Sequence, residues 1–205
     1  KNRNINYLSE DFYLFIYLLI VVAFIFVFFN YDNNFLIVLF SIASSVSNLG
    51  ISFDDTPQNL SFIFLLLVII GGSFFSTSSG LRVIKVLSLI KFSLNNLLSH
   101  TKPNQIYLNK VSLSNSITDK TDINKYFLAV IIFIISLFVV TLFLTISDIE
   151  LEKAFKIGIL TIMNTVNSSM YGVSEFDFYS LNAFTKSILI IFMIIGRIEM
   201  LTIFI

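Results

Sequence analysis

The sequence predicts an all-α membrane protein built from two repeats, each a membrane helix, a short re-entrant helix and a second membrane helix. Hydrophobic residues make up 56% of the 205 residues, and the mean hydropathy is +0.89. The longest apolar runs carry no charge, which is typical of membrane spans. The order of long run, short run, polar break and long run occurs twice along the chain, as internal repeats in transporters do.

The first repeat is expected over residues 1–95. Its opening run, 12–29, is uncharged and long enough to span a bilayer as a helix. The next run, 35–47, would form a helix of only about 20 Å, so it is expected to enter the membrane and stop there. The final run, 60–95, would be about 54 Å long as one helix, so a break is predicted at "GGSFFSTSSGLRVIK", residues 71–85.

The second repeat has the same pattern and follows a polar linker. Ser147 and Glu150 have the spacing of a capping box at the start of its short helix. The predicted boundaries are a linker over 96–125 and a repeat over 126–205, with a helix at 126–146, a short helix at 150–166, an irregular segment at 167–172 and a last helix at 183–205.

The charge distribution predicts the orientation of the chain in the membrane. Seven Lys or Arg residues but only two acids lie between Arg82 and Lys125, so this segment is expected in the cytoplasm. The connections on the other side are mainly acidic, which would concentrate cations there or simply form a solvated surface. The chain begins at Lys1 and ends within an apolar run at Ile205, so the sequence is expected to be a fragment of a longer protein.

Several classes of function are disfavoured by the same sequence. The net charge is zero, so bulk charge predicts no nucleic-acid partner. There is no cysteine, which excludes thiolate metal sites, and the one histidine, His100, lies in a basic linker where a solvated side chain is expected. No pairing of a nucleophile with a base indicates an enzyme.

An irregular polar segment follows each short helix and suggests a path for cations. Non-helical backbone at membrane depth is tolerated only inside protein or along a water-filled cavity. The end of the preceding helix would direct its partial negative charge at a cation, and backbone carbonyls could then form an ion filter.

These features resemble the Trk/Ktr/HKT potassium transporters, specifically the third and fourth of their four repeats. The stretch 71–85 is similar to that family's glycine-rich segment, and "GRIEMLTIFI", 196–205, to its Gly-Arg-Leu-Glu segment. "SVSNLGIS", 45–52, lies where the third repeat has Thr-Thr-Gly-Phe, and "LLSHTKP", 97–103, resembles a cytoplasmic stretch of the family.

The resemblance implies a four-repeat, channel-like transporter with a central pore. K⁺ would be the transported ion, with Na⁺ as the alternative and no other cofactor. It further implies a multi-pass protein in contact with membrane lipid in the cell's inner (plasma) membrane, a homodimer, and in many members a cytoplasmic nucleotide-binding regulatory subunit.

The expected filter has two parts in this chain. Gly50 is the clearest filter residue, because glycine adopts a positive φ at little cost. The fourth-repeat segment departs from the family's Asn-x-Gly-Pro-Gly, so its glycine positions fall on Ser169 and Tyr171, unless the register slips to Gly172. A degenerate pore that passes sodium or does not conduct, in a scaffold or regulatory subunit, is therefore the alternative. The expected filter residues are Ser47, Asn48, Leu49, Gly50, Ile51, Asn167, Ser168, Ser169, Met170 and Gly172.

A gate is expected below this filter. Arg197 would lie toward the inner half of the membrane, where an arginine is expected to be functional, and the family places one there in the conduction path. It would form an electrostatic barrier, and the alternative is a structural ion pair. The expected gating residues are Gly72, Ser76, Thr77, Ser78, Ser79 and Gly80 in an intramembrane loop, together with Arg197.

Overall fold

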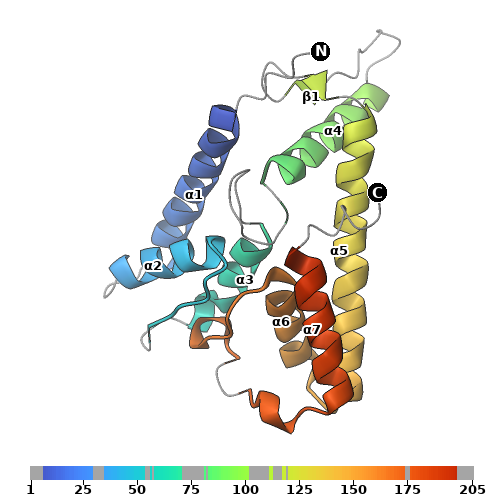
Figure 1. Ribbon diagram of the computed structural model, residues 1–205. Helices are drawn as coiled ribbons and strands as arrows, with labels where there is room; N and C mark the ends of the chain where they lie inside the picture. The colour runs from blue at the N-terminus through green and yellow to red at the C-terminus, as the bar shows by residue number, and fades with distance from the viewer. Residues whose placement is uncertain are drawn as a thin grey trace.

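The protein is almost entirely helical where its structure is described (Figure 1). The computed structural model describes residues 7–29, 35–53, 56, 58–70, 81, 83–101, 111–112, 117–118, 120–173 and 176–197. The α-helices in this part are α1 (Tyr7–Phe29), α2 (Phe35–Val46), α3 (Ser61–Ile69), α4 (Val83–Thr101), α5 (Lys120–Ile146), α6 (Leu151–Met163) and α7 (Ala183–Arg197). The described part also contains three 3-10 turns: η1 (Gln58–Leu60), η2 (Ser169–Tyr171) and η3 (Phe178–Ser180). Its two short antiparallel strands are β1 (Val111–Ser112) and β2 (Ile117–Thr118).

The helix ends differ in places from those that the sequence predicted. Helices α4 and α5 extend into the predicted linker, and the two strands pair within it, so this linker is shorter than residues 96–125. Helix α6 ends three residues before the predicted end at 166, which moves the start of the irregular segment. Of the break expected at 71–85, residues 71–80 lie outside the described part of the chain, and α4 begins within the stretch, at Val83. The residues after Arg197 also lie outside the described part.

The buried core lies where α3 meets α6. Phe64 and Val68 of α3 are fully buried, and every residue of α6 from Ile157 to Met163 is buried. Helices α3, α5 and α7 all contact α6. Hydrophobic burial drives little helix association within lipid, so close packing at small residues has to contribute. Gly158 is such a residue, because a Cβ there would lie 3.4 Å from the Leu137 side chain of α5.

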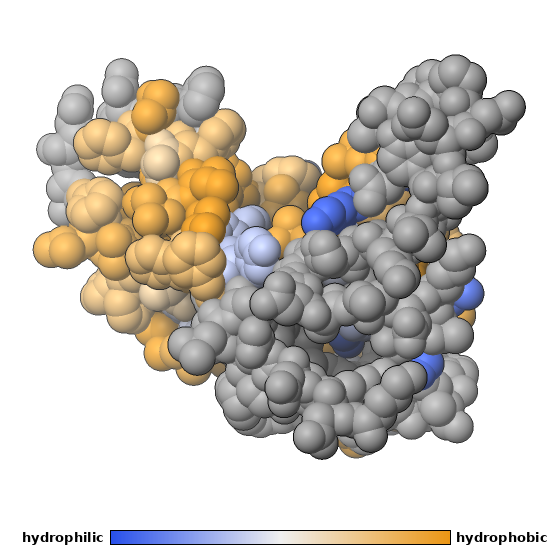
Figure 2. Space-filling model, turned by 90° about the horizontal axis from the view of Figure 1, so that it is seen from above, coloured by the Kyte–Doolittle hydropathy of each residue, from blue (hydrophilic) through white to orange (hydrophobic). Residues whose placement is uncertain are grey.

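The outer face of α5 carries exposed apolar side chains over much of its length. Phe138, Leu142 and Ile146 are 66%, 60% and 75% exposed, an arrangement typical of contact with lipid rather than with water. Among the described helices, one segment, Ile123–Ile146, is long and apolar enough to cross a membrane by itself. Seen from above, one lobe of the molecule presents a largely apolar surface (Figure 2).

The connection between α5 and α6 corrects the expected capping box. Helix α6 begins at Leu151, and its N-cap is Glu150, whose side chain makes no capping hydrogen bond. The Ser147 hydroxyl instead lies 2.7 Å from the Thr185 hydroxyl near the start of α7. The serine therefore joins the two long helices of the second repeat rather than capping the short one.

Candidate functional site: two pore segments

The short helix of each repeat ends in the same backbone motif. After α2, Asn48 has a φ of 56°, and the Leu49 N–H donates to the Ser44 carbonyl at 3.0 Å. After α6, Asn164 has a φ of 54°, and the Thr165 N–H donates to the Leu160 carbonyl at 2.9 Å. Both are Schellman-type ends with a left-handed residue, a conformation that asparagine tolerates better than most residues do.

This motif defines the register of the two repeats. Asn48 and Asn164 are equivalent, so the residue two positions further on is Gly50 in the first repeat and Val166 in the second. The sequence expectation started the second segment at Asn167, three residues too late to include Asn164. The missed signal was the asparagine that precedes the polar break in both copies, in "SVSNLG" and in "TIMNTV".

The two irregular segments, 47–53 and 164–169, are here named the first and second pore segments, after the ion filter that the sequence predicts in them. They lie side by side and run in the same direction, as three contacts show. The Asn48 side-chain amide donates to the Met163 carbonyl at 3.4 Å, and the Ser52 and Ser169 hydroxyls lie 2.9 Å apart. Between these contacts, a Cβ on Gly50 would overlap the Val166 carbonyl oxygen.

Gly50 therefore lies at the centre of this contact. Its φ is 71°, in the left-handed region that the sequence analysis expected for a filter glycine. The closeness of the Val166 backbone is a second requirement for glycine that the sequence alone did not reveal. Leu49 and Ile51 on either side are each 54% exposed, so their side chains point away from the described core.

The other expected filter residues occupy varied positions. Asn167 closes the turn through a 2.8 Å bond from its amide to the Val173 carbonyl, whereas Met170 is fully buried in the core. Gly172 has a left-handed φ of 70°, yet it lies beside Lys156 and not between the segments. Ser47 bonds back to the Ala43 carbonyl, and Ser168 and Ser169 lie at the start of η2.

Buried hydroxyl groups without a protein partner gather around the pore segments. The side-chain oxygens of Ser44, Thr165 and Ser168 are each buried with no hydrogen-bond partner among the described residues. Buried polar groups in proteins are nearly always paired with protein, water or an ion. The three oxygens lie in the second pore segment or in the last turn of α2.

Helix α7 approaches the second pore segment near its C-terminal end. The Asn164 side-chain amide donates to the Met193 carbonyl of α7 at 2.8 Å. A Cβ on Gly196 would overlap the Ile162 carbonyl, so α7 crosses the end of α6 at very short range. Arg197, whose side chain is not described, follows Gly196 and is the last residue of α7.

The expected gating loop lies outside the described residues. Its predicted members are Gly72, Ser76, Thr77, Ser78, Ser79 and Gly80.

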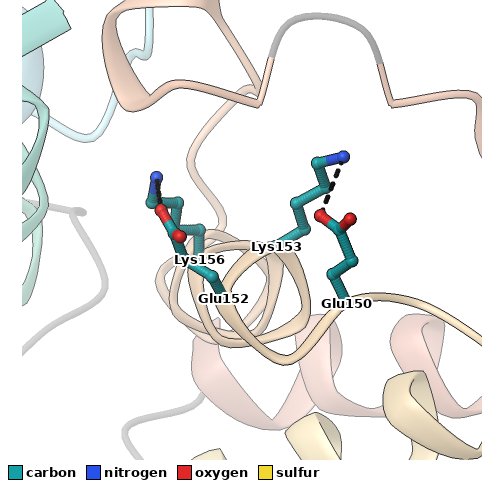
Figure 3. Close-up of polar contacts among 4 residues, drawn as sticks. All are labelled: Glu150, Glu152, Lys153 and Lys156. Atoms are coloured by element: carbon teal, nitrogen blue, oxygen red, sulfur yellow. Dashed lines mark hydrogen bonds and ion pairs between the residues drawn. The ribbon is translucent and has the colours of Figure 1, made fainter.

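Two ion pairs lie at the start of α6 and point in different directions (Figure 3). The Lys156 Nζ is 2.7 Å from the Glu152 Oε1, and the Lys156 side chain is 18% exposed. The Lys153 Nζ is 3.0 Å from the Glu150 Oε2, and both of these side chains are more than half exposed. The hydrogen bond from Lys156, followed by its positive charge, lowers the pKa of Glu152.

The all-helical fold of the described residues is similar to that of a solved membrane transporter. Among solved structures, the chain is similar to the crystal structure of the potassium transporter TrkH from Vibrio parahaemolyticus, with a TM-score of 0.76 and 22% sequence identity. The match covers 96% of this chain and 42% of the TrkH chain, so the chain spans less than half the length of that protein. No protein-family model and no curated protein matched the sequence. The resemblance inferred from the motifs is confirmed at the level of the fold.

Proposed function

We propose that this chain supplies two of the four repeats of a monovalent-cation transporter, with potassium as the transported ion. The observation that carries the proposal is the pair of pore segments. Each contains one of the two equivalent asparagines, Asn48 and Asn164, and the segments run side by side. Two such segments form half of a ring, and two more repeats would close it. Backbone carbonyls directed into such a ring would replace the water shell of a cation.

The proposed path continues past the filter to a gate. The carbonyl ends of α2 and α6 direct their partial negative charge toward the pore segments, which favours a cation there. Arg197, with the loop at 71–80, then forms the barrier that opening has to move or neutralise. The close crossing of Gly196 over the end of α6 supports a position for Arg197 just beyond the second pore segment.

The proposed setting is the inner (plasma) membrane, with several spans in contact with lipid. Helix α5 crosses it in full, and the apolar faces of α1 and α7 contribute further spans. A homodimer and a cytoplasmic nucleotide-binding regulatory subunit are proposed as partners on the resemblance to the potassium transporters alone.

One observation favours a second function. Val166 stands where the first pore segment has Gly50, so the second segment lacks the glycine that turns consecutive carbonyls toward one axis. A pore in which one of the four filter segments lacks this glycine could pass sodium, or could be closed permanently in a scaffold or regulatory subunit.

Ion uptake by the full-length protein in a potassium-uptake-deficient host separates these functions. Growth at low external potassium, with saturable uptake, supports the potassium transporter. Uptake of sodium without potassium supports the degenerate pore, and a protein that reaches the membrane without any uptake supports the scaffold.

A further inference from the structure

One pair of equivalent positions in the short helices carries chemically different residues in the two repeats. Counted back from the equivalent residues Asn48 and Asn164, Lys156 of α6 corresponds to Phe40 of α2. Phe40 packs against Phe53 at the end of the first pore segment, with ring centroids 4.9 Å apart. The second repeat has an ammonium group where the first has this aromatic contact.

The ammonium group of Lys156 lies against the chain as it leaves the second pore segment. A Cβ built on Gly172 would lie 3.4 Å from the Lys156 Nζ, and apart from Gly172 and its chain neighbours no other atom of the described residues comes within 4 Å of that position. Gly172 ends η2, which begins at Ser169, the partner of Ser52. The charge is therefore close to the end of the paired segments.

Glu152 is the counter-charge of this ammonium group. It lies one helical turn before Lys156, at 2.7 Å, and its own side chain is 79% exposed. An exposed i,i+4 pair normally adds only slightly to helix stability. Here the Lys156 side chain is only 18% exposed, and its Nζ lies beside Gly172.

We propose that Lys156 and Glu152 form a charge pair that sets the affinity of the pore for its cation. This rests on the proposed transport function. Paired, the two charges nearly cancel for a cation close to the second pore segment. Without the carboxylate, the ammonium group repels that cation, and without the ammonium group, the carboxylate attracts it. One unit charge within about a Debye length changes the local ion concentration by about twofold.

The test is the apparent KM for potassium uptake by the full-length protein, with the amount in the membrane measured for each variant. Glu152→Gln is expected to raise KM about twofold or more, and Lys156→Gln to lower it by a similar factor. The double variant should return KM to the wild-type value, because neither charge remains. Lys156→Arg keeps the charge and should leave KM unchanged. If Lys156→Gln does not reach the membrane, the test compares the KM of Glu152→Gln with that of Lys156→Arg.

The neighbouring pair supplies the matched control. Glu150→Gln and Lys153→Gln remove the same charges from the same end of α6 but from side chains that are 74% and 54% exposed. Their effects on KM are expected to be smaller than those at Glu152 and Lys156. Equal effects at both pairs, or no change at either, would overturn the inference and leave Lys156 and Glu152 as a helix-stabilising pair. A wild-type protein without cation uptake would instead overturn the proposed function, and the inference with it.

Discussion

Gly50 is restricted to glycine by two separate features. Its φ of 71° is costly for residues with a Cβ, and the Val166 backbone occupies the space that a Cβ would need. Gly172 shares the first feature, with a φ of 70°, but its Cβ would meet only the end of the flexible Lys156 side chain. The two glycines thus allow conformational cost and steric cost to be measured separately.

Gly50→Ala is expected to destabilise the protein more than Gly172→Ala does. Both variants incur about 1–2 kcal/mol for a left-handed alanine. Only Gly50→Ala also has to separate two backbone segments, so its loss should be larger and should include loss of uptake. Thermal unfolding in detergent and ion uptake measure the two effects, and equal losses at both positions would contradict the contact between the pore segments.

Arg197→Gln tests the proposed electrostatic barrier. Removing the positive charge from the cation path should raise the flux several-fold, since about 1.4 kcal/mol off a barrier is a tenfold change in rate. Lys186→Gln, near the other end of α7, removes a charge from the same helix and should not raise the flux. Unchanged transport in Arg197→Gln would instead favour a structural ion pair.

The short helices and the long helices are joined by a few specific bonds. In the second repeat, the Asn164 amide links the end of α6 to the Met193 carbonyl of α7, the helix that carries Arg197. In the same repeat, the Ser147 and Thr185 hydroxyls link α5 to α7. The first of these bonds is exposed among the described residues, and the second is part-buried.

Asn164 can be tested through two replacements that differ in one respect. Asn164→Gly removes the bond to Met193 but keeps a residue that adopts a positive φ easily. Asn164→Ala removes both, so it should lower the unfolding free energy by about 1–2 kcal/mol more than glycine does. Chemical or thermal unfolding of the purified protein compares them, and equal values would mean that the left-handed turn contributes nothing.

At the scale of the whole molecule, the two repeats are equivalent in architecture and unequal in chemistry. Helix α3 of the first repeat packs on α6 and η2 of the second, so the pore segments meet at the boundary between repeats. That boundary carries Gly50 against Val166 and Ser52 against Ser169. The difference at Val166 therefore lies at the boundary between the repeats, and Lys156 lies beside Gly172, which follows the second pore segment.

The orientation of the chain can be measured directly because it contains no cysteine. A cysteine at Lys110, in the basic linker, should react with a membrane-impermeant thiol reagent only after the cells are opened. A cysteine at Glu150, at the start of α6, should react in intact cells. The unmodified chain provides the blank, and the reverse pattern would overturn the proposed orientation of both repeats.

Much of the architecture follows from the sequence, because it depends on local and compositional properties. Uncharged runs of sufficient length must be helical in lipid, since every backbone group needs a partner there. The two-repeat pattern, the short helices and the positive φ of Gly50 follow from run lengths and from the properties of glycine. The sequence also indicates the family resemblance, through "GGSFFSTSSGLRVIK" and "GRIEMLTIFI".

The tertiary structure decided the register of the second pore segment. Helix α6 ends at Met163 because the left-handed Asn164 stops it. The sequence marks this end only by the asparagine before the polar break in both copies, and run length alone favoured an end at 166. The alternative at Gly172 matched in conformation but not in place, because a positive φ is a local property whereas contact with the other repeat is not. Which residues face each other across two repeats is set by packing between distant parts of the chain, and so only the folded molecule showed Val166 against Gly50.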